Sequence, residues 1–366
     1  MEVTDILLDL VAIPSVSPMS NAPVIEYART HLKGWKIKLY PYRDAAGVEK
    51  INLVAISRKG TQPGVAELAF VCHTDTVPYD PSWSEAVRPA IRGGKLYGRG
   101  SCDVKGFLAC VLAAVAKTET AKSLAIVLTA DEEVGCVGAK FLARKNVLRA
   151  KHMVIGEPTS LRPVSAGKGY ALAEIVVRGK EAHSAFPSRG RSAIFDAARV
   201  VSALERVAKK LEARKNRAFD PPFTTLNVGL IHGGTAKNIV AGECRITVEW
   251  RPVPGQPGDW AADLIREGLA GLRVDATLNV KRLDPAFDPS AGRNLVAMME
   301  SISGRSATTV SFGTEAAHLS GLTSEVIVFG PGDMTVAHKS GEFVPVKALH
   351  ECVGYLVELM RLADSR

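Results

Sequence analysis

Acidic and histidine side chains recur in five short motifs along this chain, and these residue types bind metal ions and move protons. The motifs are His73-Thr74-Asp75, Asp103 within 98–106, Asp131-Glu132-Glu133, Glu157 within 156–159, and His338 within 337–339. Two histidines and several carboxylates suit a pair of zinc-like ions that hold a hydroxide. A metallohydrolase is therefore the leading hypothesis.

Each of the first two motifs also has an alternative interpretation. His73 and Asp75 are two residues apart, so on a strand end both face one side, and Asp75 can orient the His73 ring. The alternative is a polar loop. Asp103 lies among glycines that permit a tight turn, where its carboxylate can bridge two cations, cap a helix, or do both.

The remaining motifs place carboxylates and a histidine in turns. Three acids follow an apolar segment at 131–133, where their repulsion is relieved by cations or a shared proton. One of them can bind metal while another moves a proton, and a surface loop is the alternative. Glu157 precedes Pro158 in a rigid turn, and His338 follows the turn-rich residues 330–333.

Apolar runs before these motifs predict the sheet edge at which they meet. His73, Asp131 and Glu157 directly follow the buried-strand patterns at 68–71, 125–128 and 153–155. Strands expected at 36–40, 51–56, 67–71 and 124–128 alternate with helices near 6–11, 23–32 and 106–116. This alternation predicts an α/β sheet with helices on both faces, and such sheets gather ligands at the carboxyl ends of their strands.

The pattern changes after Lys168 and returns near residue 287. In between, we predict strands at 170–178, 224–231, 243–251 and 274–281 and helices at 192–214 and 260–269. The helix and strand pattern of the first 168 residues resumes in the segments 294–303, 325–329 and 346–362. We therefore expect a discontinuous α/β metal-binding catalytic domain, 1–168 and 287–366, with an α+β insert at 169–286.

Composition narrows the class of protein. The chain has 366 residues and is 46% hydrophobic, enough for two domains with their own cores. It has no apolar run of membrane-spanning length and no secretory signal, so we expect a cytoplasmic enzyme without a membrane partner. The net charge of +8 raises nucleic acid as a partner. The densest basic stretch, 209–217, lacks aromatic residues and favours a solvated helix end instead.

The six cysteines lack the CxxC spacing of a thiolate zinc cluster. Cys72 and Cys102 lie next to predicted ligands. We interpret both as buried thiols, with metal ligation as the alternative.

The ordered motifs resemble the M20 family of dizinc amidohydrolases and peptidases. The matching segments are HTDTVP (73–78), GRGSCDVKG (98–106), DEEVG (131–135), GEPT (156–159) and AHKSGEFV (337–344). The resemblance implies two Zn²⁺ per chain, with Asp103 bridging them, His73 and Glu157 completing one site, and Glu133 and His338 the other. Cobalt or manganese could replace zinc at such a site.

The resemblance also implies roles beyond the metal ligands. Glu132 would be the general base, Asp75 the partner of His73, and the Asp103–Val104 peptide would be cis. The insert would be a lid through which the protein forms a homodimer. His183 of that lid would reach the other subunit's active site and donate a hydrogen bond to the developing oxyanion, although a surface histidine is the alternative. The implied substrate contacts are Asn238, Arg251, Gly313 and Thr314.

Within the family, the segments 167–190, 312–316 and 330–333 most resemble acetylornithine deacetylases and N-acetylcitrulline relatives, and succinyl-diaminopimelate desuccinylases share much of the pattern. Val104 and Ala241 stand where the family often has methionine and proline. The expected reaction removes the acyl group of an N-acyl amino acid, N²-acetyl-L-ornithine giving ornithine and acetate in arginine biosynthesis. The alternatives are a carboxypeptidase or aminoacylase, and an inactive metal-binding relative.

Overall fold

The computed structural model describes residues 1–57, 64–119, 123–288 and 293–365, which divide into two compact units. The larger unit comprises Met1–Ser165, Pro289–Thr308 and His318–Arg366, and the smaller comprises Ala166–Asp288 and Thr309–Ala317. Residues 309–317, which the sequence places in the catalytic domain, thus cluster with the insert. The reason is hydrogen bonding: Lys168 N–H donates to the Val310 carbonyl, and the Ser311 hydroxyl donates to the Asp220 carbonyl.

A mixed sheet with the order β1-β2-β6-β3-β7-β16-β8-β15 forms the centre of the larger unit, and its last two strands, β8 and β15, continue into the smaller unit. Neighbouring strands β6, β3, β7 and β16 run parallel, and β1 and β2 are antiparallel. All side chains of β6 are buried, as expected for a strand covered on both faces. The bounds are β1 Lys36–Arg43, β2 Glu49–Ile56, β3 Val65–His73, β6 Leu124–Thr129, β7 Arg149–Gly156, β8 Val164–Gly167, β15 Thr308–Val310 and β16 Thr323–Phe329.

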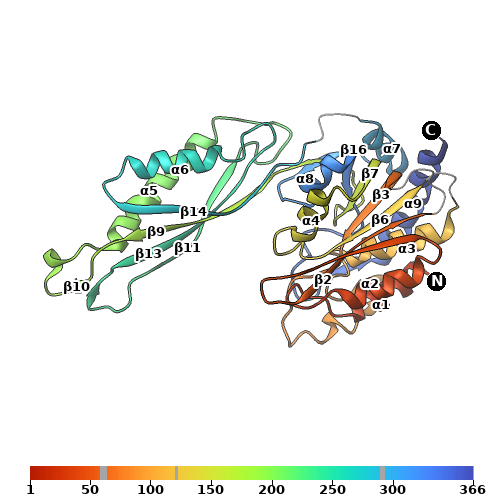
Figure 1. The fold of residues 1–366 in the computed structure, drawn as a ribbon, viewed down its shortest axis with the longest axis horizontal. Helices are drawn as coiled ribbons and strands as arrows, with labels where there is room; N and C mark the ends of the chain where they lie inside the picture. Colours follow the sequence, from red (N-terminus) through yellow and green to blue (C-terminus); the bar gives the residue numbers. More distant parts are fainter. Residues whose placement is uncertain (58–63, 120–122, 289–292, 366) are drawn as a thin grey trace. The chain divides into compact units, whose positions relative to one another are not determined.

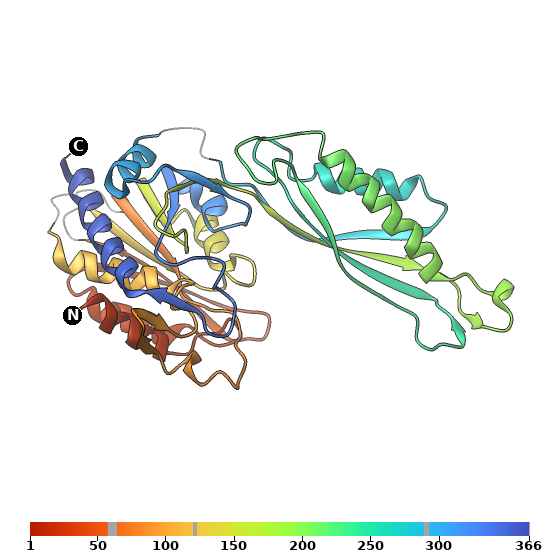
Figure 2. The same ribbon diagram turned by 180° about the vertical axis from the view of Figure 1, so that it is seen from behind.

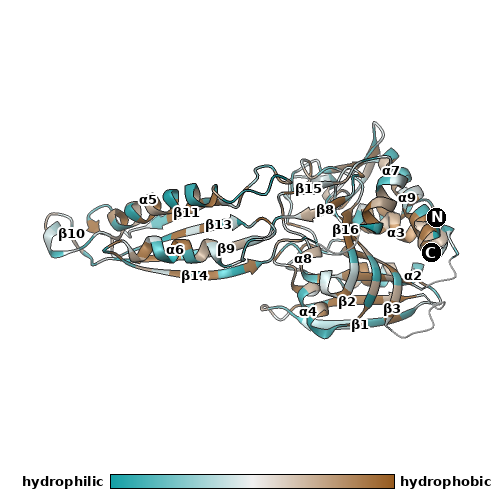
Figure 3. Ribbon diagram, turned by 90° about the horizontal axis from the view of Figure 1, so that it is seen from above, coloured by the Kyte–Doolittle hydropathy of each residue, from teal (hydrophilic) through white to brown (hydrophobic). Residues whose placement is uncertain are grey.

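Helices cover both faces of this sheet. On one face α3 (Lys105–Lys117) packs against α1 (Val3–Ala12) and α9 (Val346–Ser365), and α9 also contacts α7 (Asn294–Ser303) (Figures 1 and 2). Helix α2 (Ala22–His31) contacts β2 and α3, and α4 (Val137–Lys145) lies on the opposite side of the sheet (Figure 3). Among the described residues, no helix combines the length and apolarity that a membrane crossing requires.

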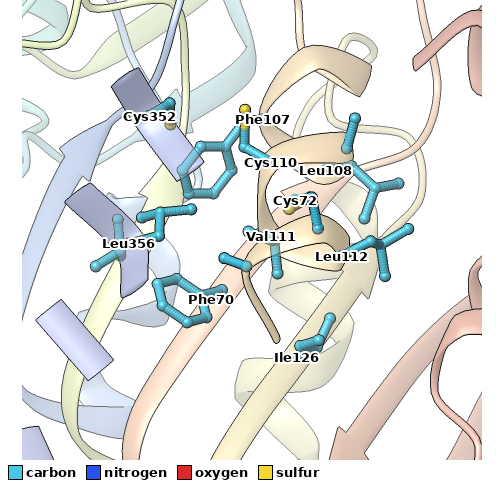
Figure 4. Packing of buried hydrophobic residues seen from close by; sticks show 14 of the residues in the cluster. Phe70, Cys72, Phe107, Leu108, Cys110, Val111, Leu112, Ile126, Cys352 and Leu356 are labelled. Atoms are coloured by element: carbon cyan, nitrogen blue, oxygen red, sulfur yellow. The ribbon is translucent and has the colours of Figure 1, made fainter. Parts of the chain in front are cut away.

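The core of the larger unit lies between the sheet and α3. Helix α3 is apolar all round because neighbouring elements surround it, and its residues 105–114 are buried. Figure 4 shows Phe70 and Cys72 of β3 beside Val111 of α3 and Leu356 of α9. Cys72 and Cys102 are both buried, as the sequence predicts.

The smaller unit has an antiparallel sheet in the order β11-β13-β9-β14, with α5 and α6 on one face (Figures 1 and 2). Apolar and polar side chains alternate along its strands. Ile175 and Ile246 are buried in the cluster with the helices, whereas their neighbours Glu174 and Arg245 form an ion pair at 2.9 Å. The bounds are β9 Tyr170–Arg178, β11 Thr225–Gly233, β13 Glu243–Arg251, β14 Asp275–Asp284, α5 Ala193–Leu211 and α6 Trp260–Ala270.

Several short elements complete the structure and were not predicted. Three-residue strands pair in the order β17-β5-β4, and two-residue strands β10 and β12 pair in the smaller unit. Their bounds, with the short helices, are β4 Ala90–Arg92, β5 Lys95–Tyr97, β10 Ala182–His183, β12 Ile239–Val240, β17 Phe343–Pro345, α8 Ala316–Leu319, η1 Ser84–Ala86, η2 Pro187–Arg189 and η3 Ser320–Leu322.

Candidate metal centre

Parallel strands bring the predicted motifs to one edge of the larger unit's sheet. His73 is the last residue of β3, and the segments 131–133 and 157–159 follow β6 and β7. His73 lies opposite Thr129 in the β3–β6 register, so these loops leave the sheet at the same level. Gly156 is the last residue of β7. A Cβ at this position would lie 2.1 Å from the Phe107 ring, so only glycine fits there. The motifs therefore gather at the carboxyl ends of the strands, as predicted.

Four of the five predicted metal ligands are in direct contact. His73 Nε2 lies 3.1 Å from Asp103 Oδ1, and His338 Nε2 lies 3.2 Å from Asp103 Oδ2. His338 Nε2 is also 3.2 Å from Glu133 Oε1. One ligand atom from each of His73, Asp103 and Glu133 lies within 4.8 Å of the others. Asp103 thus offers one oxygen to each histidine, and its peptide bond to Val104 is cis, as predicted.

Glu157, the fifth predicted ligand, is buried beside this cluster with 4% of its surface exposed. Burial raises the pKa of its carboxyl well above the ordinary value, and the charges of Asp103 and Glu132 raise it further. A buried acid among other acids is stabilised either by a proton or by a cation. The donor set of this edge, two imidazoles and three carboxylates, fits divalent metal ions.

The contacts within the cluster set the protonation of the histidines. Hydrogen bonds to Asp103 and Glu133 raise the pKa of His338 to about 10. Burial lowers the pKa of His73, but the contact with Asp103 and the charges of Glu132 and Asp75 together outweigh it and leave that pKa well above 6.5. Burial raises the pKa of Asp103, yet the two histidines bring it far below its usual range. A metal ion must displace the histidine protons, since only the neutral ring binds metal.

Asp75 holds the loop that carries Glu132 and Glu133. Its Oδ1 accepts the Glu132 N–H at 3.0 Å, and its Oδ2 accepts the Glu133 N–H at 3.3 Å and the Ser17 hydroxyl at 2.8 Å. His73 Nδ1 lies 3.0 Å from the carbonyl oxygen of Asp75 and 3.7 Å from its carboxylate. The backbone of Asp75 therefore makes the closer contact to the His73 ring, and its side chain fixes the acidic loop.

The three consecutive acids point in different directions. Glu132 is partly exposed, receives a hydrogen bond from the Cys136 thiol at 3.4 Å, and its charge raises the pKa of both His73 and Glu157. Asp131 instead accepts a hydrogen bond from the Tyr42 hydroxyl at 2.8 Å and pairs with Lys50 at 3.0 Å. Asp131 therefore anchors the loop, whereas Glu133 contacts His338.

Three buried charged residues near the Asp103 loop had no role in the sequence interpretation: Arg99, Lys105 and Glu342. Glu342 accepts hydrogen bonds from Arg99 and from the backbone N–H of Asp103. The Lys105 ammonium donates to the Ile13 carbonyl at 2.7 Å, and burial lowers its pKa to about 7. All three residues lie inside the motifs at 98–106 and 337–344, which was the available signal.

His183 and the predicted substrate contacts form two groups at opposite ends of the smaller unit's sheet. His183 pairs with Ile239, and Ser184 N–H donates to the Asn238 carbonyl at 3.0 Å. Arg251 ends β13, and its guanidinium lies 4.5 Å from the centroid of the Tyr170 ring. Between the two groups run the nine residues of β13, which span roughly 30 Å at the usual rise per residue. Asn238 and Arg251 are therefore not brought together.

Gly313 and Thr314 belong to the Arg251 end. A Cβ at Gly313 would lie 3.6 Å from the Cβ of Tyr170, the residue whose ring contacts Arg251. Thr314 is buried, and its hydroxyl accepts the Ala316 N–H at 3.2 Å. The Thr314 hydroxyl thus accepts a hydrogen bond from the first residue of the short helix α8.

Comparisons with known proteins agree with these observations. The model of peptidase family M20/M25/M40 matches residues 69–362. The chain is 47% identical to an acetylornithine deacetylase of Myxococcus xanthus, covering 96% of this chain and 94% of that protein. It shares the fold of aminopeptidase PepT from Bacillus cereus (TM-score 0.76, 21% identity, 99% and 98% covered). It also shares the fold of a dinuclear metal-binding M20 peptidase from Bacillus subtilis (TM-score 0.67, 13% identity, 99% and 98% covered).

Proposed function

The chain belongs to peptidase family M20/M25/M40, and from this premise we propose that it hydrolyses N²-acetyl-L-ornithine to L-ornithine and acetate. The observation that carries the proposal is the 47% identity to an acetylornithine deacetylase over nearly the full length of both chains. Membership of the family makes the chain a metal-dependent amidohydrolase, and the relatives supply the substrate class, an N-acyl amino acid.

We propose two Zn²⁺ ions, held by Asp103 between them, by His73 and Glu157 on one side, and by Glu133 and His338 on the other. The contacts of both Asp103 oxygens with histidines support the shared carboxylate. The burial of the Glu157 carboxyl near the charges of Asp103 and Glu132 supports a cation there, because a cation would offset the repulsion between these acids. When bound, the ions would lower the pKa of a water molecule and polarise the amide carbonyl.

Glu132 is the proposed general base and acid. It takes a proton from the attacking water, the water oxygen adds to the amide carbon, and the C–N bond breaks as Glu132 delivers the proton to the leaving amine. Acetate and the free α-amine of ornithine result. The hydrogen bond from the Glu132 N–H to Asp75 at 3.0 Å supports this role because it fixes the base against its neighbours.

Arg251, Gly313 and Thr314 are proposed to contact the substrate from one end of the smaller unit. The guanidinium of Arg251 suits a carboxylate by its paired N–H groups. Its packing against the Tyr170 ring, at 4.5 Å, limits the directions it can take. The α-carboxylate of N-acetylornithine is the group that this arrangement would bind.

We further propose a homodimer formed through the smaller unit, in which His183 and Asn238 serve the active site of the partner. Phe195 is 74% exposed and lines, with Ile194 and Ile239, a cavity of about 650 Å³ at the His183 end. Exposed apolar patches of this kind mark protein interfaces. A partner chain would cover these side chains and receive the His183 hydrogen bond at the developing oxyanion.

A substrate panel tests the proposed function. Zinc-loaded and cobalt-loaded protein is assayed on N-acetylornithine, N-acetylcitrulline, N-succinyl-diaminopimelate and a set of dipeptides. We expect the highest kcat/KM on N-acetylornithine. A higher value on another acylated amino acid or on dipeptides would reassign the substrate, and no turnover of any of them would favour an inactive metal-binding relative.

A further inference from the structure

A buried ion pair joins the two segments that carry Asp103 and His338. Arg99 Nη1 donates to Glu342 Oε2 at 2.5 Å, and the side chains of Arg99 and Glu342 are 4% and 0% exposed. Arg99 lies four residues before Asp103, and Glu342 lies four residues after His338. The pair therefore links two segments that are distant in sequence and that both reach the metal centre.

The second oxygen of Glu342 is directed at the backbone that carries Asp103. Glu342 Oε1 accepts the N–H groups of Cys102 and Asp103, each at 3.0 Å. At the other end of the loop, Gly98 N–H donates to the Glu342 carbonyl at 3.1 Å. This second contact continues the β5–β17 ladder, in which Tyr97 lies opposite Phe343. Glu342 thus holds the loop 98–103 at both of its ends.

The loop has little room to take another position. A Cβ at Gly106 would lie 2.4 Å from the Ser101 carbonyl, and one at Gly332 would lie 2.5 Å from the Cys102 sulfur. Two histidines occupy the two oxygens of Asp103. A small shift of the Asp103 backbone would therefore change both contacts at once.

The energetics of the pair also point away from a purely structural role. Burying two charges costs several kcal/mol of desolvation each, and a buried pair often adds no more stability than an apolar pair of similar size. The Glu342 carboxylate accepts hydrogen bonds from Arg99 and from the backbone N–H groups of Cys102 and Asp103. Groups that hold a metal ligand in place commonly change metal affinity when they are altered.

We propose that Glu342 is a positioning residue of the metal centre. Its carboxylate fixes the Asp103 backbone so that the two oxygens of Asp103 face His73 and His338, and Arg99 keeps the Glu342 carboxylate turned toward that backbone. The proposal rests on the proposed function in one respect, which is that Asp103 and His338 bind the ions.

Glu342→Gln tests this proposal with little change in size. The amide has one donor end, which must face either Arg99 or the two backbone N–H groups, so one set of hydrogen bonds is lost. We expect zinc affinity to fall by roughly tenfold or more, as for other residues that support metal ligands. The measurements are competition with a chromophoric chelator and the visible absorption spectrum of the cobalt-loaded protein, which reports ligand geometry.

Glu342→Asp is the second variant, in case the amide prevents folding. It keeps the negative charge beside Arg99 but is one methylene shorter, so it cannot reach both Arg99 and the backbone N–H groups. We expect the same loss of zinc affinity and a changed cobalt spectrum. A folded Glu342→Asp or Glu342→Gln protein with wild-type affinity and spectrum would overturn the proposal.

Glu325 provides the matched control in the same unit. It is also buried, at 7% exposed, and accepts the Leu295 N–H at 2.6 Å at the start of α7. Glu325→Gln and Glu325→Asp should keep wild-type zinc affinity, and an equal loss in these variants would also overturn the proposal. Zinc affinity and the cobalt spectrum do not depend on turnover. A wild-type protein that binds zinc but does not hydrolyse N-acetylornithine in the substrate panel would therefore refute the proposed function and leave the role of Glu342 untouched.

Discussion

In each unit of this protein one group of side chains departs from ordinary burial, and the two groups depart in opposite directions. In the larger unit, ionisable groups are buried beside the carboxyl end of β3: His73 is 2% and Asp103 5% exposed. In the smaller unit, large apolar side chains are exposed, with Phe195 at 74% and Leu230 at 55%. Both departures are unfavourable without a partner, because buried charge must be paired and exposed apolar area seeks cover. We propose that cations bind the first group of side chains and that a partner chain covers the second.

The two units also differ in how many of their predicted site residues lie together in one chain. Four of the five predicted metal ligands touch one another within a single chain. The predicted substrate contacts of the smaller unit instead lie at the two ends of β13, roughly 30 Å apart. With the proposed dimer, changes in the larger unit should act within one chain, whereas changes at the His183 end should act between chains.

The largest effect is expected from Asp103→Ala, because this side chain contacts both histidines. Metal content should fall below two ions per chain, and kcat should fall by about a thousandfold or more. Elemental analysis after dialysis and steady-state assays measure the two quantities. Asp196→Ala, which removes a buried aspartate of the smaller unit, is the control and should keep its metal. A variant of Asp103 that retains two zinc ions would refute the shared carboxylate.

Glu132→Gln should separate chemistry from metal binding. The change removes the proposed proton carrier at nearly constant size, so kcat should fall by about a hundredfold or more with zinc content unchanged. The assay is kcat measured beside elemental analysis of the same sample. Loss of zinc would make Glu132 a ligand, and retained turnover would remove it from the mechanism.

His183→Ala should lower kcat by about a hundredfold, the loss typical of one oxyanion donor, without affecting metal content. Mixing it with Glu132→Gln distinguishes action between chains from action within one. In a mixed dimer, a site with its own Glu132 and the partner's His183 is intact, so about half of the wild-type activity should return. No recovery in isolated mixed dimers would contradict the shared active site.

Zinc affinity should rise with pH between 6 and 8. The pKa of His338 is raised to about 10 by Asp103 and Glu133, so its ring holds a proton throughout this range and must release it to the ion. Each released proton strengthens apparent affinity about tenfold per pH unit. Chelator competition at several pH values measures the slope, and an affinity independent of pH would contradict proton displacement.

Phe195→Glu should weaken the dimer by about tenfold or more, since it places a charge on the exposed apolar surface of the smaller unit. Sedimentation velocity over a range of concentrations measures this change. Ile91→Glu is the matched control, because Ile91 is also exposed, at 47%, but lies in the larger unit. Equal effects of the two changes would remove the smaller unit as the interface.

Sequence periodicity predicted long elements well. The predicted bounds of β9 and β13 agree with the structure because alternation continues over nine residues in each. Strands β5 and β17 were missed because three residues carry no period. Their pairing brings Glu342 beside Cys102 and Asp103, so the sequence placed Glu342 in a motif but could not predict these contacts.

Spacing predicted partners only where the backbone stayed regular. His73 and Asp75 are two apart, which predicted a side-chain contact on a strand, but β3 ends at His73. Beyond that point the Asp75 carboxylate turns to the N–H groups of Glu132 and Glu133. Asn238 and Arg251 were grouped by resemblance. The structure separates them because Asn238 precedes β13 and Arg251 is its last residue.

Titration of chelator-stripped protein with zinc tests the central claim most directly, with the rate of N-acetyl-L-ornithine hydrolysis measured at each addition. We predict no turnover without metal, a maximal rate at two ions per chain, and the same uptake without turnover in Glu132→Gln. A rate that does not depend on added metal, or an unchanged titration in Asp103→Ala, would contradict the account.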